Sequence, residues 1–426
     1  MLTRFFLIGC GFLPGLMALG QARASFSLQE AYTALEERYP ALQNAGVLES
    51  IYQTELAQLD IALLPSLTLH ADGRLQSEST QLESSEMSLP IEIDQPLVSV
   101  RAYAEARYNI LDGGSNEAQR RLKKAQLQSG LQGIEVERFA LRERINQLFI
   151  NIETLRQQAG VFDLSLQDLQ ARKEQVAAAV AYGSLLESEL TKIEVKELEI
   201  KTQQDNLKLR LDGLFGTLYQ LTGIPLRPDA ELQFPQMESP LNIPALERPE
   251  QPLFQSQREA ILAQSDMIEA RKKPQLNAYA QAGTGYPNPL NILDNNIAPF
   301  GLIGLQLNWQ ITDWKKSQKD KELLSLKAQQ VQHSEATFNF NLETQTANYL
   351  AEIKRLTALI AQDKNIAELQ ARILEQSAAQ LDEGIITSAD YITQLNAELL
   401  SRQNLLIHQT ELLATQLEFW NERGAF

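Results

Sequence analysis

Cysteine is nearly absent from this 426-residue sequence, and long apolar runs are few. The one cysteine, Cys10, lies in the N-terminal segment, so the rest of the chain has no disulfide framework. After Ser25 no run of about eighteen consecutive apolar residues occurs, which excludes a transmembrane helix there. If this protein enters a membrane, it must do so through strands.

Basic residues are also in deficit, because 38 Lys and Arg face 54 Asp and Glu, for a net charge of −16. Such a surface repels phosphate backbones, which argues against nucleic acid as a partner. The three histidines, His70, His333 and His408, lie far apart, and the sequence has no H-E-x-x-H, no Gly-rich phosphate loop and no G-x-S-x-G. We therefore expect neither an enzyme nor a bound metal or other cofactor.

Residues 1–24 have the features of a secretory signal peptide. A short basic start is followed by a largely apolar stretch and by Ala22-Arg23-Ala24, an A-x-A cleavage site. Cleavage there would remove two arginines and no acid, which takes the net charge from −16 to −18. The alternative is a lipobox that would make Cys10 a lipid anchor, but only five residues, Phe5 to Gly9, would then form the apolar stretch.

The remaining chain contains the same unit twice. Pro40 and Pro65 recur 209 residues later as Pro249 and Pro274, while Gly183 recurs 201 residues later as Gly384. Constant spacing of several landmarks indicates a duplication. We expect a first repeat over 25–223, a proline-rich crossing segment over 224–252 and a second repeat over 253–426.

Each repeat is predicted to contain a helix, two strands and two further helices. Alternation of apolar and polar residues predicts strands over about 66–77, 97–111, 274–285 and 300–311. Apolar residues in steps of 4 and 3 predict two long helices, over about 115–181 and 315–382. The first would be roughly 100 Å long at 1.5 Å per residue, longer than a compact domain needs.

The four strands are too few to close a barrel, and open edges cannot lie in lipid. If they span a bilayer, several chains must therefore pool them into one barrel. The apolar faces would meet lipid, and the polar faces would line a watery lumen with Arg74, Arg101, Glu105 and Arg107. The alternative is a soluble antiparallel sheet, which alternates in the same way.

Between the long helices and their successors we expect tight hairpin tips, over about 182–188 and 383–389. Gly384 would end one helix in the left-handed conformation, and Thr387-x-x-Asp390 would begin the next as a capping box. Gly183 and Ser184-x-x-Glu187 would do the same in the first repeat. Caps do not explain the apolar pairs beside these glycines, and exposed apolar groups at a tip favour contact with a partner.

The sequence resembles the TolC-like outer-membrane efflux and secretion channels, also called outer membrane factors. The resemblance covers residues 25–424 and rests on the duplication, on "SLQEAYTALEERYPAL", "LPSL", "KPQL" and "YNILDGGS", and on the hairpin "EGIITSADYITQLNAELL". One departure is "ITDWKK" at the second strand-to-helix junction, where the first repeat has Gly-Gly.

The resemblance implies a mainly α fold with membrane β: a homotrimer whose twelve strands form an outer-membrane barrel and whose helices continue it through the periplasm of a Gram-negative bacterium. It also implies outer-membrane lipid, a periplasmic adaptor protein and an inner-membrane pump as partners. The adaptor would dock on the tip at Gly183, Ser184, Leu185, Gly384, Ile385 and Ile386. An entrance gate would include Asp390 and its counterpart Glu189, although an acid at a helix N-terminus has a simpler role in stabilising the helix.

These observations together favour a passive exit duct of a tripartite efflux or type I secretion system. The competing function is a periplasmic coiled-coil spacer or adaptor without a pore. An adaptor would carry one hairpin and a lipoyl-like β domain, whereas this sequence predicts two hairpins.

Overall fold

The computed structural model describes residues 23–78, 95–235, 247–291 and 293–424. These residues fall into two compact units, one formed by 23–40, 140–235 and 345–424 and the other by 41–78, 95–139, 247–291 and 293–344. The expected signal peptide up to residue 22, including Cys10, lies outside the described residues, as does most of the first inter-strand loop.

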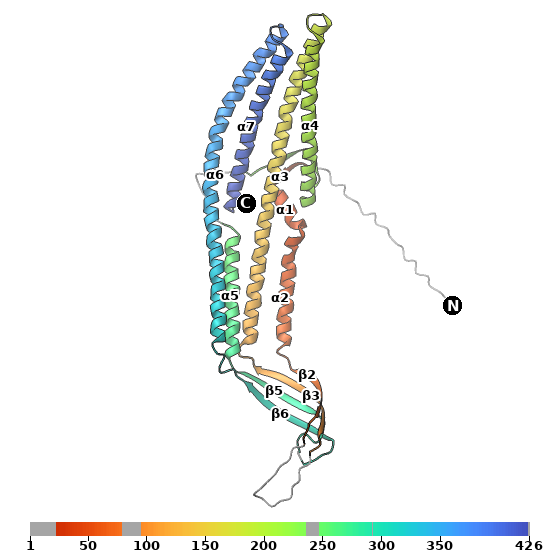
Figure 1. Ribbon diagram of the computed structural model, residues 1–426, viewed down its shortest axis with the longest axis vertical. Coiled ribbons are helices and arrows are strands. Elements are labelled where there is room, and N and C mark those ends of the chain that lie inside the picture. Colours follow the sequence, from red (N-terminus) through yellow and green to blue (C-terminus); the bar gives the residue numbers. More distant parts are fainter. Residues whose placement is uncertain (1–22, 79–94, 236–246, 292, 425–426) are drawn as a thin grey trace, which may run out of the picture. The chain divides into compact units, whose positions relative to one another are not determined.

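The second unit contains one antiparallel sheet with the strand order β2-β3-β5-β6 (Figure 1). The strands are β2 (Ser66–Leu75), β3 (Val98–Leu111), β5 (Gln275–Tyr286) and β6 (Ala298–Asn308). Strands β2 and β3 come from the first repeat and β5 and β6 from the second, so the central β3–β5 pairing joins the two repeats.

The last strand ends earlier than its sequence pattern predicts. Trp309 and Ile311 continue the alternation, and the strand was expected to reach about residue 311. However, Asn308 pairs with Gln275, the first residue of β5, so the backbone beyond it has no neighbouring strand in the sheet. Lys273 and Pro274 precede β5, and proline cannot donate a ladder hydrogen bond.

Helices run beside one another in this unit. Helix α2 (Asn44–Ile61) lies along the first part of α3 (Ser115–Ala181), and α5 (Glu250–Lys272) lies along the first part of α6 (Lys316–Asp382) (Figure 1). Ion pairs join each couple: Lys123 to Glu55 at 2.6 Å in the first, and Arg258 to Glu335 in the second.

The first unit contains two helical hairpins whose turns lie at the same end (Figure 1). One is the remainder of α3 with α4 (Glu187–Thr222), and the other is the remainder of α6 with α7 (Ser388–Glu422). The unit also contains α1 (Leu28–Arg38). It includes two short parallel strands, β1 (Arg23–Ser27) and β4 (Leu226–Gln233), which the sequence pattern did not predict.

One apolar cluster holds the two hairpins together. Its α3 members recur every seven residues, and so do its α4 members, which is the spacing of a coiled-coil seam. The buried members from both hairpins are Leu155, Phe162, Leu169, Val176, Ile193, Ile200, Leu207, Ala378, Leu381, Tyr391, Leu395 and Leu399. Among the described residues, no helix combines the length and apolar character needed to cross a bilayer.

Candidate functional site: the hairpin turns and the polar strand face

The two hairpin turns begin in the same way. Gly183 has a φ of 75° and Gly384 a φ of 69°, the left-handed conformation in which glycine meets no Cβ penalty. In the first turn Ser184 N–H donates to the carbonyl of Ala179 at 2.9 Å, and in the second Ile385 N–H donates to that of Gln380 at 2.8 Å. Both helices thus end in a Schellman motif, which satisfies carbonyls that would otherwise lack a partner.

The second turn then starts α7 with a capping box. Thr387 Oγ1 accepts from the backbone N–H of Asp390 at 3.3 Å, and the Asp390 carboxylate accepts from the N–H of Thr387 at 3.1 Å. The Thr387 hydroxyl also donates to the Asp390 carboxylate at 2.7 Å, and this bond, followed by that from the Thr387 N–H, holds the pKa of the Asp390 carboxyl below its ordinary value. Asp390 is exposed and keeps its negative charge at neutral pH.

The capping box expected at Ser184-x-x-Glu187 in the first turn is wrong. Helix α4 begins after Leu186, whose side chain has no oxygen to accept a hydrogen bond, and Ser184 Oγ instead donates to the Ala179 carbonyl at 2.8 Å. The position equivalent to Thr387 is therefore Leu186, and the position equivalent to Asp390 is Glu189.

Glu189 instead caps the start of α7, in the other hairpin. Its carboxylate accepts from the backbone N–H of Ser388, the first residue of α7, at 2.8 Å, and it forms an ion pair with Lys192 at 2.7 Å. The Lys192 hydrogen bond, followed by that of Ser388, holds the Glu189 pKa below its ordinary value against the opposing effect of burial. One carboxylate therefore links the two repeats at their turns.

The apolar residues of the turns divide between the core and the surface. Leu185 and Ile386, which occupy equivalent positions, pack against the apolar cluster. Ile385 is 72% exposed, and Leu186 is 73% exposed and Tyr182 90% exposed, although neither of the latter two was among the predicted docking residues. A groove of about 420 Å³ between the turns is lined by Ser184, Leu185 and Gly384 among others.

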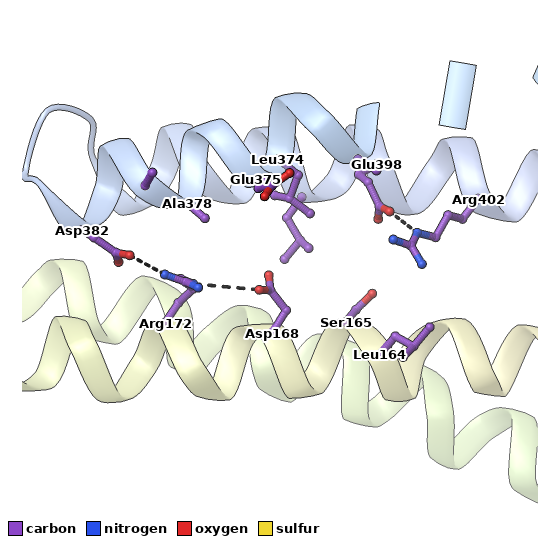
Figure 2. A pocket seen from close by; sticks show the side chains of 13 residues that line it. Leu164, Ser165, Asp168, Arg172, Leu374, Glu375, Ala378, Asp382, Glu398 and Arg402 are labelled. Atoms are coloured by element: carbon purple, nitrogen blue, oxygen red, sulfur yellow. Dashed lines mark hydrogen bonds and ion pairs between the residues drawn. The ribbon is translucent and has the colours of Figure 1, made fainter. Parts of the chain in front are cut away.

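A second set of polar contacts joins the hairpins below the turns. Figure 2 shows Arg172 of α3 between Asp168, at 3.9 Å, and Asp382 of α6, at 2.6 Å. The hydroxyl of Tyr391, a fully buried residue of α7, donates to the Asp168 carboxylate. Burial raises the Tyr391 pKa, and the Asp168 hydrogen bond raises it further.

Close to these contacts, the pocket drawn in Figure 2 has a volume of about 410 Å³. Glu398 of α7 lines it and is only 2% exposed, and its carboxylate is paired with Arg402. The sequence pattern did not identify this group, because Arg172 of α3 and Asp382 of α6 lie 210 residues apart in the chain.

The predicted lumen residues share the polar face of the sheet. Arg101 pairs with Asp72 of the neighbouring strand at 3.1 Å, and Arg107 pairs with Glu105 at 2.8 Å. Glu105 also accepts a hydrogen bond from Gln281 at 2.6 Å. Arg74 is exposed and forms no ion pair with any residue that the structure describes. Nor do the described residues contain a group of three His, Cys, Asp or Glu that could hold a metal ion.

No protein-family model matches the sequence, and no curated protein sequence matches it. Solved structures do match its fold. The outer membrane protein VceC of Vibrio cholerae superposes with a TM-score of 0.66 at 14% identity, over 93% of this chain and 96% of that one.

The CmeC outer membrane channel of Campylobacter jejuni gives a TM-score of 0.67 at 14% identity, covering 93% of this chain and 85% of that one. The MtrE outer membrane channel of Neisseria gonorrhoeae gives 0.65 at 14%, covering 93% and 88%. The predicted fold is confirmed: the chain folds as these outer-membrane channel proteins do, with the helix, strand, strand, helix, helix order in each repeat.

Proposed function

We propose that this chain is one protomer of a passive outer-membrane exit duct, the outermost part of a tripartite efflux or type I secretion system in a Gram-negative bacterium. The observation that carries the proposal is the two-faced sheet. The channel fold supports it.

One face of the sheet is apolar and uncovered in the single chain. Ile303 is 87% exposed, Leu69 80% and Leu67 78%. Covering a side chain of this size stabilises by about 1.5–3 kcal/mol, so a sheet that left many of them in water would be unstable and prone to associate. The apolar face suits contact with lipid. The opposite face, which carries the ion pairs, suits contact with water.

The edges of the sheet require further copies of the chain. Within the part of the chain that the structure describes, β2 and β6 each pair on one side only. Unpaired backbone groups are too costly to leave in lipid, so β6 of one copy would pair with β2 of the next until the ring closes. The resemblance to TolC-like channels implies three copies, with a barrel of twelve strands continued by helices through the periplasm.

The hairpin turns supply the docking surface for a periplasmic adaptor of an inner-membrane pump. We assign this surface to Gly183, Ser184, Leu185, Gly384, Ile385 and Ile386, and we add Leu186 and Tyr182 because of their exposure. Asp390 and Glu189 would place negative charge at the closed entrance. Both carboxylates are ionised at neutral pH, as a charge filter requires, and their lowered pKa values extend this charge to more acidic pH.

Substitution of Gly384 tests the docking surface. A Cβ at this position meets no atom within 4 Å, so Gly384→Ala adds backbone strain without a clash. Gly384→Trp adds comparable strain, roughly 1–2 kcal/mol, together with a bulky side chain on the proposed surface.

We expect both variants to assemble as trimers and to conduct ions, and we expect only Gly384→Trp to lose export in cells that supply the pump. Normal export by Gly384→Trp would refute the docking assignment. Loss of export by both variants would show that the turn conformation, and not the added side chain, causes the loss. That result would also count against the docking assignment.

A further inference from the structure

The junction between β6 and α6 carries a tryptophan and a lysine in a conformation that suits glycine. Trp314 has a φ of 51° and Lys315 a φ of 68°. At the equivalent junction of the first repeat, Gly113 and Gly114 have φ angles of 67° and 83°. The left-handed conformation is disfavoured for residues with a Cβ, so the second repeat holds this turn with less suitable residues.

The turn itself is the same in both repeats. The Asp313 carboxylate accepts from the backbone N–H groups of Lys315 and Ser317, each at 3.0 Å. In the first repeat Asp112 accepts from the N–H of Gly114 at 2.8 Å in the same manner. Because glycine serves this turn better, the backbone geometry does not account for Trp314 and Lys315.

Trp314 follows β6, six residues after Asn308, the last residue of that strand. It is 95% exposed. Ile311 and Trp309 precede it and are 76% and 55% exposed, and they continue the apolar sequence alternation of β6 toward the junction. The indole N–H of Trp309 donates to the carbonyl of Lys272 at 3.1 Å, which ties Trp309 to the end of α5.

Basic side chains gather beside these apolar residues in a chain that is otherwise acidic. Arg271, Lys272 and Lys316 line one pocket of about 100 Å³, together with the acids Asp313 and Asp320. Lys273 and Lys315 are exposed neighbours of these cations along the chain. Five cations therefore lie near three acids, namely Asp313, Asp320 and Glu269, and the turn holds the carboxylate of Asp313.

Most of these cations form no direct ion pair among the described residues. Arg271, Lys273, Lys315 and Lys316 form no ion pair with a residue in the described part of the chain, whereas Lys272 lies 3.9 Å from Glu269. By contrast, Lys319 and Lys321, one turn further along α6, are paired with Glu322 and Glu269. The cations nearest Trp314 are thus the ones available to an external anion.

We propose that Trp314, Lys315 and Lys316, with the neighbouring basic residues, bind phospholipid headgroups where the strands leave the membrane. Indole rings favour the level of the headgroups, since one edge is polar and the body is apolar. Ammonium and guanidinium groups attract lipid phosphates. The inference rests on the proposed function, because it needs the apolar strand face to lie in lipid.

Tryptophan fluorescence in vesicles tests the position of the indole. The sequence has three tryptophans, so Trp309→Phe combined with Trp420→Phe leaves Trp314 as the only emitter in the full chain. The protein is inserted into vesicles of phosphatidylethanolamine and phosphatidylglycerol whose acyl chains carry bromine near the headgroup or near the methyl end.

We expect Trp314 emission to be quenched, and more strongly by bromine near the headgroup. A matched variant that keeps only Trp420, which is 7% exposed in α7, should show little quenching from either lipid. If the vesicles conduct ions but Trp314 is not quenched, a second copy or water covers the indole. The headgroup inference is then overturned, while the proposed function stands. If the protein neither inserts nor conducts, the proposed function falls with it.

The lysines are tested by the lipid that remains bound after purification. Lys315→Gln with Lys316→Gln should lower the amount of phosphatidylglycerol that copurifies with the full chain. The matched control, Lys319→Gln with Lys321→Gln, removes the same charge from paired side chains and should leave that amount nearly unchanged. Equal losses in both variants, or no loss in either, would overturn the assignment of the headgroup contact to the junction.

Discussion

Tyr391→Phe removes one hydroxyl from the contact between the two hairpins and leaves the ring in place. Tyr391 is fully buried, and its hydroxyl donates to the Asp168 carboxylate. A hydrogen bond to a charged acceptor contributes about 1.5–3 kcal/mol. Because the Asp168 side chain is 35% exposed, water can partly replace the lost donor. We therefore expect the lower end of that range, about 1.5 kcal/mol.

Amide hydrogen exchange along α7 measures this contribution in the assembled protein. A loss of about 1.4 kcal/mol corresponds to a tenfold change in the opening equilibrium, so the first turns of α7 should exchange roughly ten times faster in the variant. Tyr182→Phe is the matched control, since Tyr182 is 90% exposed at the adjacent turn, and it should leave exchange unchanged. Identical exchange in wild type and Tyr391→Phe would refute the reasoning.

The same residue predicts a dependence on alkaline pH. The Tyr391 pKa is raised above its ordinary value of 10.0, so the folded state favours the neutral phenol. Its contribution to stability is complete below that ordinary value and is lost as the pH rises above it toward the folded-state pKa. Exchange in α7 should therefore increase above pH 10 in the wild type, and Tyr391→Phe should lack this component.

Two further predictions concern charged groups. Glu189→Ala should speed exchange at the start of α7, because it removes the acceptor of the Ser388 N–H, while Glu187→Ala, in the same helical turn, should not. The Glu189 pKa lies below its ordinary value of 4.5, so this contribution is present above pH 4.5 and is lost as the pH falls below it. Arg74→Gln should shift ion selectivity toward cations more than Arg101→Gln, whose charge is already balanced by Asp72, as reversal potentials across a salt gradient will measure. Equal shifts from both arginine variants would contradict the assignment of an unpaired Arg74 to the lumen.

Periodic patterns in the sequence predicted the elements whose form depends on local spacing. Helix α3 shows its seven-residue repeat in Phe162, Leu169 and Val176, and the structure buries these residues in one seam. The strands follow from alternation, since Leu67 and Leu69 lie on one face and Thr68 on the other. Such patterns record which face of an element is covered.

Elements that depend on distant partners could not be predicted in the same way. Strand β4 is short and lies in a proline-rich segment, and it exists because it pairs with β1, about two hundred residues away. The end of β6 was misplaced because alternation continues through Trp309, whereas the ladder stops where β5 begins. Strand pairing, rather than local composition, determines both the existence of β4 and the end of β6.

In the candidate site, too, local features could be predicted from the sequence and contacts between distant residues could not. Gly183 and Gly384 were identifiable because left-handed turns favour glycine. The role of Glu189 was not, because its acceptor function involves Ser388, 199 residues later in the chain. Likewise, nothing adjacent to Tyr391 in sequence indicates that its hydroxyl meets Asp168.

The central claim is that the apolar face of the four strands meets lipid and that several copies of the chain close one water-filled pore. Recording ionic current after adding the purified full-length chain to a planar lipid bilayer tests it most directly. The account predicts discrete conductance steps of one size, each from one assembled oligomer. A chain that leaves the bilayer electrically silent, and that stays monomeric in buffer without detergent, would contradict it.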